Sequence, residues 1–441
     1  MNLARVGIVS IGRRLTTARI VQPLRHRDFA LLTGGRTVSL VGDGFFFVAL
    51  AWQVYLISND PGALSLVFLA GSIPLVAFLL LGGALSDRYD RRLLMIGADV
   101  VRGIAIGVLG LLSISGQIQL WHIAVVEAIA GGASAFFNPA STAIVPDVLP
   151  DADLPQANAL FGILRRMTVS LLGPALGGIV VAAFGPGPAF IVDALSFAGS
   201  AVAVFAIQAR PTVHHDTENS LRHTLGQMRE GFVYVRQKPW IWATLLSAML
   251  SLLFFIGPVQ VLLPFLVKNS LDLGPDSLGT ILAFGAVGAI AMGLTIGHFG
   301  LPRRRVTVMF LAFSLGVAGM AGYGVMSVLW QALLIAAVTN AMFELGDVIW
   351  TTLLQQLVPR NFLGRVSSLD WMLSTGLVPL SYALVGPVSA VLGPRTTMVA
   401  GALIGAVVMF ALIVVPGVRD PERQPLPAPD SGQGGEDLVG L

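Results

Sequence analysis

The sequence predicts an all-α integral membrane protein whose twelve transmembrane helices form two six-helix bundles. Of its 441 residues, 55% are hydrophobic and only 12% are charged, whereas a soluble domain carries about 25% charged residues. Long apolar runs alternate with short polar turns, and basic residues gather in every second turn. A chain of this composition has too little polar surface for water, so lipid is its expected solvent.

Twelve apolar runs are long enough to cross the bilayer as helices, which takes about 20 residues each. Backbone groups left unpaired in hydrocarbon cost several kcal/mol, so these runs must be helical. We place the first six spans near residues 29–57, 63–86, 93–115, 118–145, 158–183 and 187–208. The second six lie near residues 240–267, 277–299, 306–327, 329–356, 366–392 and 396–416.

The Lys and Arg residues lie almost entirely in alternate loops. Those loops hold twenty-one of the 27 basic residues, the opposite loops hold only Lys268 and Arg395, and four arginines lie within spans. Because positively charged loops stay in the cytoplasm, both termini are predicted to be cytoplasmic. Residues 1–28 carry six arginines and no small-residue cleavage site, which argues against a cleaved signal peptide. We expect a multi-pass protein of the bacterial inner membrane.

Three segments are predicted to lie outside the bundles. The predicted order along the chain is a cytoplasmic segment (1–28), a first bundle (29–208), a cytoplasmic central loop (209–239), a second bundle (240–416) and a cytoplasmic tail (417–441). The central loop has apolar residues at three- and four-residue spacing among arginines, which predicts an amphipathic helix at the membrane surface. These apolar residues are Leu221, Leu225, Met228, Phe232 and Val235. The tail is rich in Pro and Gly and is predicted to be disordered.

An internal repeat with an offset of 213 residues relates the two bundles. Val145-Pro146 corresponds to Val358-Pro359, and Gly173-Pro174 corresponds to Gly386-Pro387, at the same place in each half. Transporters are commonly built from duplicated halves whose interface holds the substrate site. The shared offset therefore favours a six-plus-six architecture.

The turn after the second span carries a charged motif. Its glycine allows helices to approach closely, its aspartate can accept hydrogen bonds or charge from a helix end, and its arginines anchor one membrane side. The motif residues are Gly83, Asp87, Arg88, Arg91 and Arg92. This turn resembles the Gly-x-x-x-Asp-Arg-x-Gly-Arg-Arg signature of the major facilitator superfamily, where it latches the outward-facing state. Asp90 replaces the second glycine, as in the enterobactin-exporter-like branch. A generic positively charged turn is the alternative.

The fifth span carries a second motif. Gly173, Pro174, Gly177 and Gly178 match the Gly-Pro-x-x-Gly-Gly element of exporters in this superfamily. Small residues permit tight helix packing and proline permits a bend, and the resemblance implies efflux, as an antiporter, rather than uptake. An incidental kink is the alternative, since Gly and Pro are ordinary in membrane helices. The arginine that such exporters often carry in the fourth span is absent, because this chain has Glu127 there.

Ionisable side chains occur within several spans. Each costs roughly 2.5–3.5 kcal/mol at membrane depth on insertion scales, so each normally faces a cavity or a partner. We expect Asp43, in the middle of the first span, to carry the coupling proton, because desolvation there favours the neutral carboxyl. The other proton-coupling candidates are Glu127, Glu344 and Asp347. Glu344 and Asp347 are three residues apart and could share a proton; structural hydrogen bonding is their alternative role.

Two ion pairs are predicted from spacing. Arg36 and Asp43 lie seven residues apart on nearly one face of the first span, and Asp99 and Arg102 lie three apart in the third. Asp193 and Asp370 lie nearer helix ends, and we assign them structural roles. Arg165 and Arg166 are interpreted as membrane anchors, with contact to an anionic substrate as the alternative.

Several classes of protein are excluded by missing residues. The only lysines, Lys238 and Lys268, do not form the Gly-Lys-Ser/Thr loop of a nucleotide-driven pump. The chain has no His-Glu-x-x-His zinc pattern and no cysteine, so it has no thiolate metal site, disulfide or Cys nucleophile. A Ser–His pairing stays open. We expect no cofactor, no metal and no nucleic-acid partner.

The sequence thus predicts a secondary transporter and not an enzyme. The resemblance implies proton-coupled efflux of a small amphipathic compound, such as a drug, a macrolide-like compound or a siderophore, by alternating access. Its expected partners are this substrate, a coupling ion (the proton) and the lipid bilayer, and a monomer is expected. The alternatives are a proton- or sodium-coupled importer and a channel.

Overall fold

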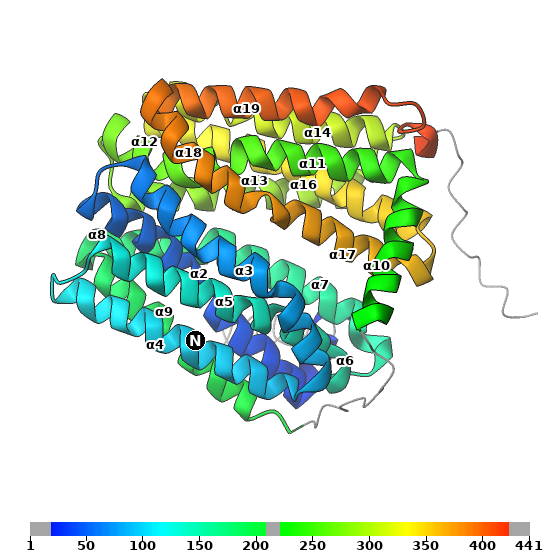
Figure 1. Ribbon diagram of the computed structural model, residues 1–441, viewed down its shortest axis with the longest axis horizontal. Coiled ribbons are helices and arrows are strands. Elements are labelled where there is room, and N and C mark those ends of the chain that lie inside the picture. Colours follow the sequence, from blue (N-terminus) through cyan, green and yellow to red (C-terminus); the bar gives the residue numbers. More distant parts are fainter. Residues whose placement is uncertain (1–18, 209–220, 423–441) are drawn as a thin grey trace, which may run out of the picture.

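The computed structural model describes residues 19–208 and 221–422. Within this part of the chain the secondary structure is helical, with no strand. Twelve helices or stacked helix segments are long and apolar enough to cross a membrane, which confirms the predicted number of spans. The spans form two bundles that lie side by side, one from each half of the chain (Figure 1).

The first half supplies six spans, of which the fifth is a stack of three segments. These are α2 (Arg27–Ile57), α3 (Pro61–Arg88), α4 (Arg91–Ile114), α5 (Leu120–Ala143), the stack of α7 (Leu154–Arg165), the π-helical η3 (Arg166–Leu172) and α8 (Gly173–Phe184), and α9 (Pro186–Phe205). The short helices η1 (Arg19–Arg25), α6 (Val145–Val148) and η2 (Asp151–Asp153) complete this half.

The second half has the same plan, and its seventh span is again a stack. It contains α11 (Pro239–Gly257), the π-helical η4 (Pro258–Leu262) and α12 (Leu263–Ser270), then α13 (Pro275–Phe299), α14 (Arg305–Gly319) with α15 (Gly322–Val325), α16 (Leu329–Leu357), α17 (Arg360–Gly376) with α18 (Val378–Leu392), and α19 (Pro394–Ala411). Short 3-10 turns follow at Leu412–Val414 and Asp420–Glu422.

Proline sets where several spans begin. Pro61, Pro186, Pro239, Pro275 and Pro394 each stand at the first position of a helix. The missing N–H of proline is not needed there, and its fixed φ suits the first turn. These spans therefore begin one or two residues before the positions that the apolar pattern alone predicts.

The two halves meet along α8 with α13 and along α3 with α18. Close to the end of α2, the Tyr55 hydroxyl donates to the Val261 carbonyl at 2.6 Å, and the Asn59 and Asn269 amides bond to each other. Among the described residues, the side-chain hydrogen bonds between neutral groups and from Lys268 join the halves on this side of the bundle core. The ion pair between Arg166 and Glu344 joins the halves about midway along their spans. The opposite end of the molecule, where α10 runs across the bundle ends (Figure 1), has no such bond between described residues.

The predicted amphipathic helix of the central loop is present as α10 (Leu221–Arg236). It packs on α17 and α11 of the second half. The Tyr234 ring stacks on Phe362 with centroids 4.7 Å apart, and Glu230 accepts a hydrogen bond from Arg365 at 2.7 Å. Of the predicted apolar face, Val235 is buried and Phe232 is 58% exposed. The side chains of residues 221–228 lie outside the described ones.

The disorder predicted for the tail from residue 417 is wrong for its first six residues. Val418 is buried, and the Glu422 carboxylate accepts hydrogen bonds from the Thr307 backbone N–H at 2.5 Å and hydroxyl at 3.1 Å. Thr307 lies in the first turn of α14, so Glu422 satisfies an N–H that the helix itself leaves unpaired. Residues 1–18, 209–220 and 423–441 lie outside the described part of the chain.

Candidate functional site

Arg91 holds together the turn between α3 and α4. Its Nη1 donates to the Asp147 carboxylate at 2.6 Å and to the Ala143 carbonyl at 2.9 Å, and its Nε donates to the Ser86 carbonyl at 3.3 Å. One guanidinium thus joins the last turn of α3, the end of α5 and the short α6. This is the charge-assisted, multidentate role that arginine fills best.

For other residues in the charged turn after the second span, the structure gives a capping role to Asp90 and corrects the packing role predicted for Gly83. Asp90 caps α4 by accepting from the Arg92 backbone N–H at 2.8 Å, which gives the departure from the superfamily pattern a structural purpose. Gly83 does not mediate close packing, because nothing lies within 4 Å of a Cβ atom added there. Gly82 does so instead, since its Cβ would overlap the Ala135 carbonyl of α5. The Asp87 side chain lies outside the described ones.

The remaining arginines of the motif differ in their surroundings. Arg92 donates to the carbonyl of Phe205, the last residue of α9, at 2.9 Å. A guanidinium at a helix C-terminus satisfies a free carbonyl and complements the helix dipole. Arg88 is exposed. The motif arginines on α4 therefore join this helix to α3, α5, α6 and α9 of the first half.

The exporter-like motif packs α8 against helices of both halves. Its four residues, Gly173, Pro174, Gly177 and Gly178, occupy the first turns of α8. A Cβ atom at Gly173 would lie 2.8 Å from Gly44 Cα on α2, and one at Gly178 would lie 2.7 Å from the Pro275 carbonyl on α13. Because these distances leave no room for a side chain, glycine is required for both contacts.

A central cavity of about 440 Å³ lies between the two halves. Its lining includes the carboxylate of Asp43 and the polar side chains of Gln260, Tyr323 and Asn340 among apolar and aromatic residues. Both π-helical segments, η3 and η4, contribute to its wall. π-Helical turns in helices are frequent at functional sites, and ligand sites of this kind are mostly apolar with a few polar groups.

A second cavity of about 300 Å³, here called the N-half cavity, lies among α2, α3, α4, α5 and α9 with α18 at one side. Asp43, Arg102, Glu127 and Asp193 all line it. Asp43 therefore borders both cavities. Asp43 and Asp193 interact electrostatically with each other and with Arg102. Asp193 was assigned a structural role from sequence, but its buried carboxylate belongs to this charged group.

Arg102 and Asp99 form the ion pair that their spacing predicts. Arg102 Nη2 donates to Asp99 Oδ1 at 2.5 Å, and both side chains are buried. The guanidinium also lies between two aromatic rings, 4.5 Å from the centroid of Phe137 and 4.3 Å from that of Phe197. Stacking of this kind suits the planar, weakly hydrated guanidinium.

The ion pair predicted between Arg36 and Asp43 is wrong. Both residues are described, and no ion pair joins them in the described chain. The Arg36 guanidinium lies 4.6 Å from the centroid of the Phe161 ring and donates to the Ser141 carbonyl at 3.4 Å. Asp43 therefore has no ion pair with Arg36, and it lines the central cavity and the N-half cavity.

The proton shared between Glu344 and Asp347 stays a prediction, and the structure favours the structural alternative for Glu344. Glu344 forms an ion pair with Arg166 of the first half, so its charge is already compensated. Asp347, one turn farther along α16, faces a separate pocket inside the second half. The ion pair also corrects the role of Arg166, which connects the two halves across the membrane interior.

Glu127 has no ion-pair partner among the described residues. It lines the N-half cavity, and within the described chain no basic side chain lies close enough to form an ion pair with it. Its carboxylate packs directly over Gly71 of α3, where a Cβ atom would overlap it. The half-buried Glu127 carboxylate therefore faces the N-half cavity without a compensating cation among the described residues.

Sequence reasoning missed a polar connection between the cavities. The Tyr382 hydroxyl donates to the Gln260 side chain, and the Tyr382 carbonyl accepts from the Ser65 hydroxyl of the other half. Its ring stacks on Phe68 at 5.3 Å. The only sequence signal for this connection is a glutamine within an apolar span, which normally hydrogen-bonds to another helix.

Comparison with known families covers nearly the whole chain. A family model described as "Transmembrane secretion effector", of the major facilitator superfamily, matches residues 18–428. The chain belongs to this transporter family. It is therefore a transporter and not an enzyme, as its sequence predicts.

Several relatives of this transporter are named as efflux proteins. It is 25% identical to the multidrug efflux pump Tap of Mycolicibacterium fortuitum (90% of this chain, 97% of the relative). It is 23% identical to macrolide efflux protein A of Streptococcus pyogenes (81% and 88%) and 25% identical to the enterobactin exporter EntS of Citrobacter koseri (92% and 95%). Its fold matches a bacterial homologue of the iron transporter ferroportin, with a TM-score of 0.67 at 17% identity over 88% of this chain and 99% of that one.

Proposed function

We propose that this transporter exports small amphipathic compounds in exchange for protons by alternating access. The efflux names of its relatives and the exporter-like motif support the direction of transport. The mostly apolar central cavity with a few polar groups suits an amphipathic substrate. We also propose that both termini are cytoplasmic, because the basic loops lie on that side.

The observation that carries proton coupling is the position of Asp43 between two cavities. From the central cavity its carboxylate can contact a substrate. From the N-half cavity it interacts with Asp193 and Arg102. Protonation of Asp43 removes its attraction to Arg102 and its repulsion of Asp193, which changes how α2 packs on α4 and α9. Substrate and proton then favour different states, which is the requirement for exchange.

The hydrogen bonds between the halves support an assignment of the conformation. They lie on the side of the 58–60 turn, which the basic-loop pattern assigns to the outer face. We assign the structure to a state closed toward the outside, in which the central cavity is loaded from the cytoplasmic side or the inner leaflet. Opening requires the α8–α13 and α3–α18 contacts to separate.

Transport into everted membrane vesicles with an imposed pH gradient tests this function. With [14C]erythromycin or ethidium as the probe, the native chain should accumulate substrate only while the gradient persists. Asp43→Asn should abolish the gradient-dependent part. Asp272→Asn, the same chemical change at an exposed turn residue with φ +54°, should leave it intact because asparagine tolerates this backbone conformation.

Other outcomes would identify a different function. Unchanged gradient-driven accumulation in Asp43→Asn would remove Asp43 from the coupling. A requirement for sodium instead of the pH gradient would change the coupling ion, and accumulation by right-side-out cells would indicate an importer. Steady ion conductance through the purified chain would indicate a channel.

A further inference from the structure

Gln260 is a polar side chain in an apolar π-helical turn beside the central cavity. It belongs to η4 (Pro258–Leu262), whose sequence Pro-Val-Gln-Val-Leu has no other polar side chain. Its side chain lines the central cavity. Proton exchange through Asp43 uses this cavity without any role for the Gln260 amide. Because an amide in an apolar span costs free energy unless it is hydrogen-bonded, its partners indicate what it does.

The Tyr382 hydroxyl occupies only one end of this amide. It donates to Gln260 Oε1, and the N–H groups of Gln260 Nε2 have no hydrogen-bond partner among the described residues. An amide nitrogen is a donor only. Gln260 is therefore free to donate to an oxygen atom in the central cavity, and Tyr382 fixes which end of the amide is available.

Contacts on both sides of Gln260 hold the backbone of η4 in place. The Gly257 backbone N–H donates to the Ser381 hydroxyl of α18 at 2.9 Å. The Val261 carbonyl accepts from the Tyr55 hydroxyl of α2 at 2.6 Å. A Cβ atom at Gly257 would lie 2.6 Å from the Ser381 carbonyl oxygen, so these two segments leave no room for a side chain. A helix of each half thus helps to position Gln260.

The Tyr382 side chain is itself held by α3 of the first half. Its ring stacks on Phe68 with centroids 5.3 Å apart, and its backbone carbonyl accepts from the Ser65 hydroxyl. Ser65 and Phe68 are three residues apart, so they lie on one face of α3. The α3–α18 contact that joins the halves therefore also positions Tyr382, and through it the Gln260 amide. Opening of this contact removes that support.

We propose that Gln260 selects compounds with a carbonyl or ether oxygen, to which its Nε2 donates a hydrogen bond, and that Tyr382 positions the amide for this contact. The inference rests on the proposed function in placing the exported compound in the central cavity. In the state closed toward the outside, the amide is already oriented, and an oriented donor binds more tightly than one that must first be ordered. Opening of the α3–α18 contact frees the amide and weakens binding where the compound leaves.

The free donor discriminates against compounds that lack an acceptor. Such a compound would cover the Gln260 N–H groups with hydrocarbon, and a polar group buried without a partner costs free energy. The rest of the cavity wall is mostly apolar, so the oxygen should belong to a compound that is otherwise hydrophobic. From the value of one neutral hydrogen bond, we expect a preference of about five- to tenfold.

Equilibrium binding of two matched probes to the purified full-length chain in phosphatidylcholine nanodiscs tests the proposal. The first is tritiated (4-benzoylbenzyl)trimethylammonium, which has a ketone between its rings. The second is tritiated (4-benzylbenzyl)trimethylammonium, which has a methylene there, and the permanent charge keeps both probes soluble. The ratio of their dissociation constants measures recognition of the ketone oxygen alone. The native chain should bind the ketone about five- to tenfold more tightly.

Three variants assign this preference to particular side chains. Gln260→Met keeps the length of the side chain but removes the amide, and should bring the ratio close to one. Tyr382→Phe removes only the positioning hydroxyl and should lower the ratio about threefold through weaker ketone binding, with binding of the methylene probe unchanged. Ser65→Ala removes one contact that holds Tyr382 and should change the ratio in the same direction. A purely structural defect would weaken both probes alike and leave the ratio unchanged.

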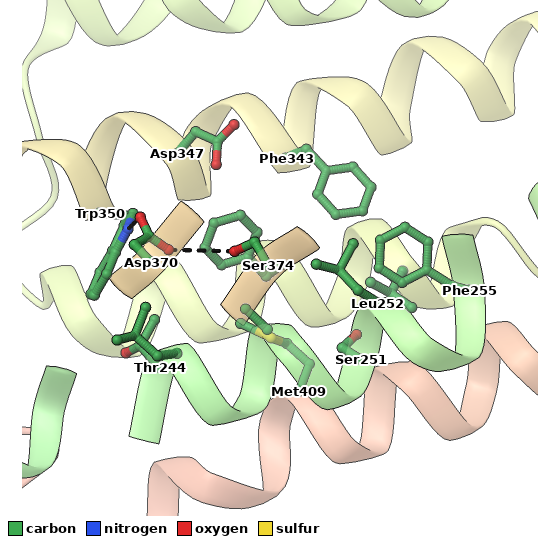
Figure 2. Close-up of a pocket in the computed structure, with 14 residues that line it drawn as sticks. Thr244, Ser251, Leu252, Phe255, Phe343, Asp347, Trp350, Asp370, Ser374 and Met409 are labelled. Atoms are coloured by element: carbon green, nitrogen blue, oxygen red, sulfur yellow. Dashed lines mark hydrogen bonds between the residues drawn. The ribbon is translucent and has the colours of Figure 1, made fainter. Parts of the chain in front are cut away.

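Matched controls make the same chemical changes elsewhere. Gln355→Met and Tyr89→Phe alter exposed side chains and should retain the native ratio. A pocket inside the second half is the alternative location for the probes. Figure 2 shows Asp347 and Asp370 bordering this pocket, and Gln260 does not line it, although Phe255 lines both spaces. Asp347→Asn should therefore leave both dissociation constants unchanged.

Four results would overturn the proposal. The first is equal affinity of the native chain for the two probes, or no saturable binding of the ketone. The second is a ratio that Gln260→Met retains. The third is a native ratio in Tyr382→Phe, whether both affinities fall together or neither changes. The fourth is a loss of ketone affinity in Asp347→Asn, which would place the probe in the other pocket.

Failure of this proposal and failure of the proposed function give different results. The binding ratio needs no pH gradient, so each of the four results leaves proton exchange through Asp43 intact. Conversely, accumulation of erythromycin that does not depend on the gradient, together with a native binding ratio, would contradict the proposed function and not the role of Gln260.

Discussion

Replacing Gly178 by alanine is expected to weaken the contact between α8 and α13 that joins the two halves. The added Cβ atom would lie 2.7 Å from the Pro275 carbonyl, 3.1 Å from Asp276 Cα and 3.2 Å from Gly279 Cα. All three are backbone atoms and cannot rotate away, so the helices must separate. Inserting one methyl group into a packed contact typically costs about 1–3 kcal/mol.

The steric clash in Gly178→Ala raises the free energy only of the state in which α8 contacts α13. The α8 helix is expected to stay helical in every state, so the greater helix propensity of alanine cancels when states are compared. Only a state with the α8–α13 contact closed has the steric clash. A difference of about 1–3 kcal/mol changes the ratio of two states by roughly 5- to 150-fold, here in favour of the state open at this contact.

Cysteine labelling measures that ratio directly, because the native chain has no cysteine. Ser65 is 2% exposed at the interface between the halves, so Ser65→Cys should react slowly with an impermeant maleimide added outside whole cells. Adding Gly178→Ala should raise the labelling rate by roughly 5- to 150-fold. Gly34→Ala, at a position with nothing within 4 Å of the new Cβ atom, is the matched control.

The reasoning would be refuted if Gly178→Ala and Gly34→Ala labelled at the same rate. Such a result would mean that α8 and α13 adjust to the methyl group without separating. A rise in labelling from the cytoplasmic side alone, measured in everted vesicles, would instead contradict the assignment of this end of the molecule to the outer face.

Two further predictions concern stability, measured as the midpoint of thermal unfolding in detergent. Gly82→Ala should destabilise the first half by about 1–3 kcal/mol, because the new Cβ atom meets the backbone of α5. Gly83→Ala adds a Cβ atom in open space and should be neutral or slightly stabilising. Equal unfolding midpoints for the two variants would be evidence against the assigned packing. Arg102→Leu should lower the free energy of unfolding by about 3–5 kcal/mol, because it leaves Asp99 buried and unpaired. Adding Asp99→Asn should recover most of this loss. A double variant no more stable than Arg102→Leu would contradict the pairing.

Short-range relationships were predictable because one helix determines them. Asp99 and Arg102 are three residues apart, and helix geometry alone brings their side chains together. The same reasoning failed for Arg36 and Asp43, seven residues apart. The Arg36 guanidinium instead contacts the ring of Phe161, which lies far along the chain. A favourable face on one helix does not predict a pair when another helix offers a competing contact.

In the candidate site, too, properties of a single span were predictable, whereas contacts between spans were not. Asp43 and Glu127 were identified as ionisable groups at membrane depth, and both line cavities. Asp193 was misjudged because its distance from a helix end says nothing about the helices around it. The partner of Glu344 lies on a span of the other half, and no periodicity in either span relates the two.

The sequence by itself determined the number of spans, their grouping into two halves, the expected membrane orientation and the superfamily. These follow from the preference of each segment for lipid or water and from local motifs, which are properties of contiguous residues. Only the tertiary structure decided which glycine admits a neighbouring helix, which carboxylates share a cavity, and which arginine has a carboxylate partner. Those outcomes depend on how each helix is rotated and tilted against its neighbours, and packing among all twelve spans sets these angles together.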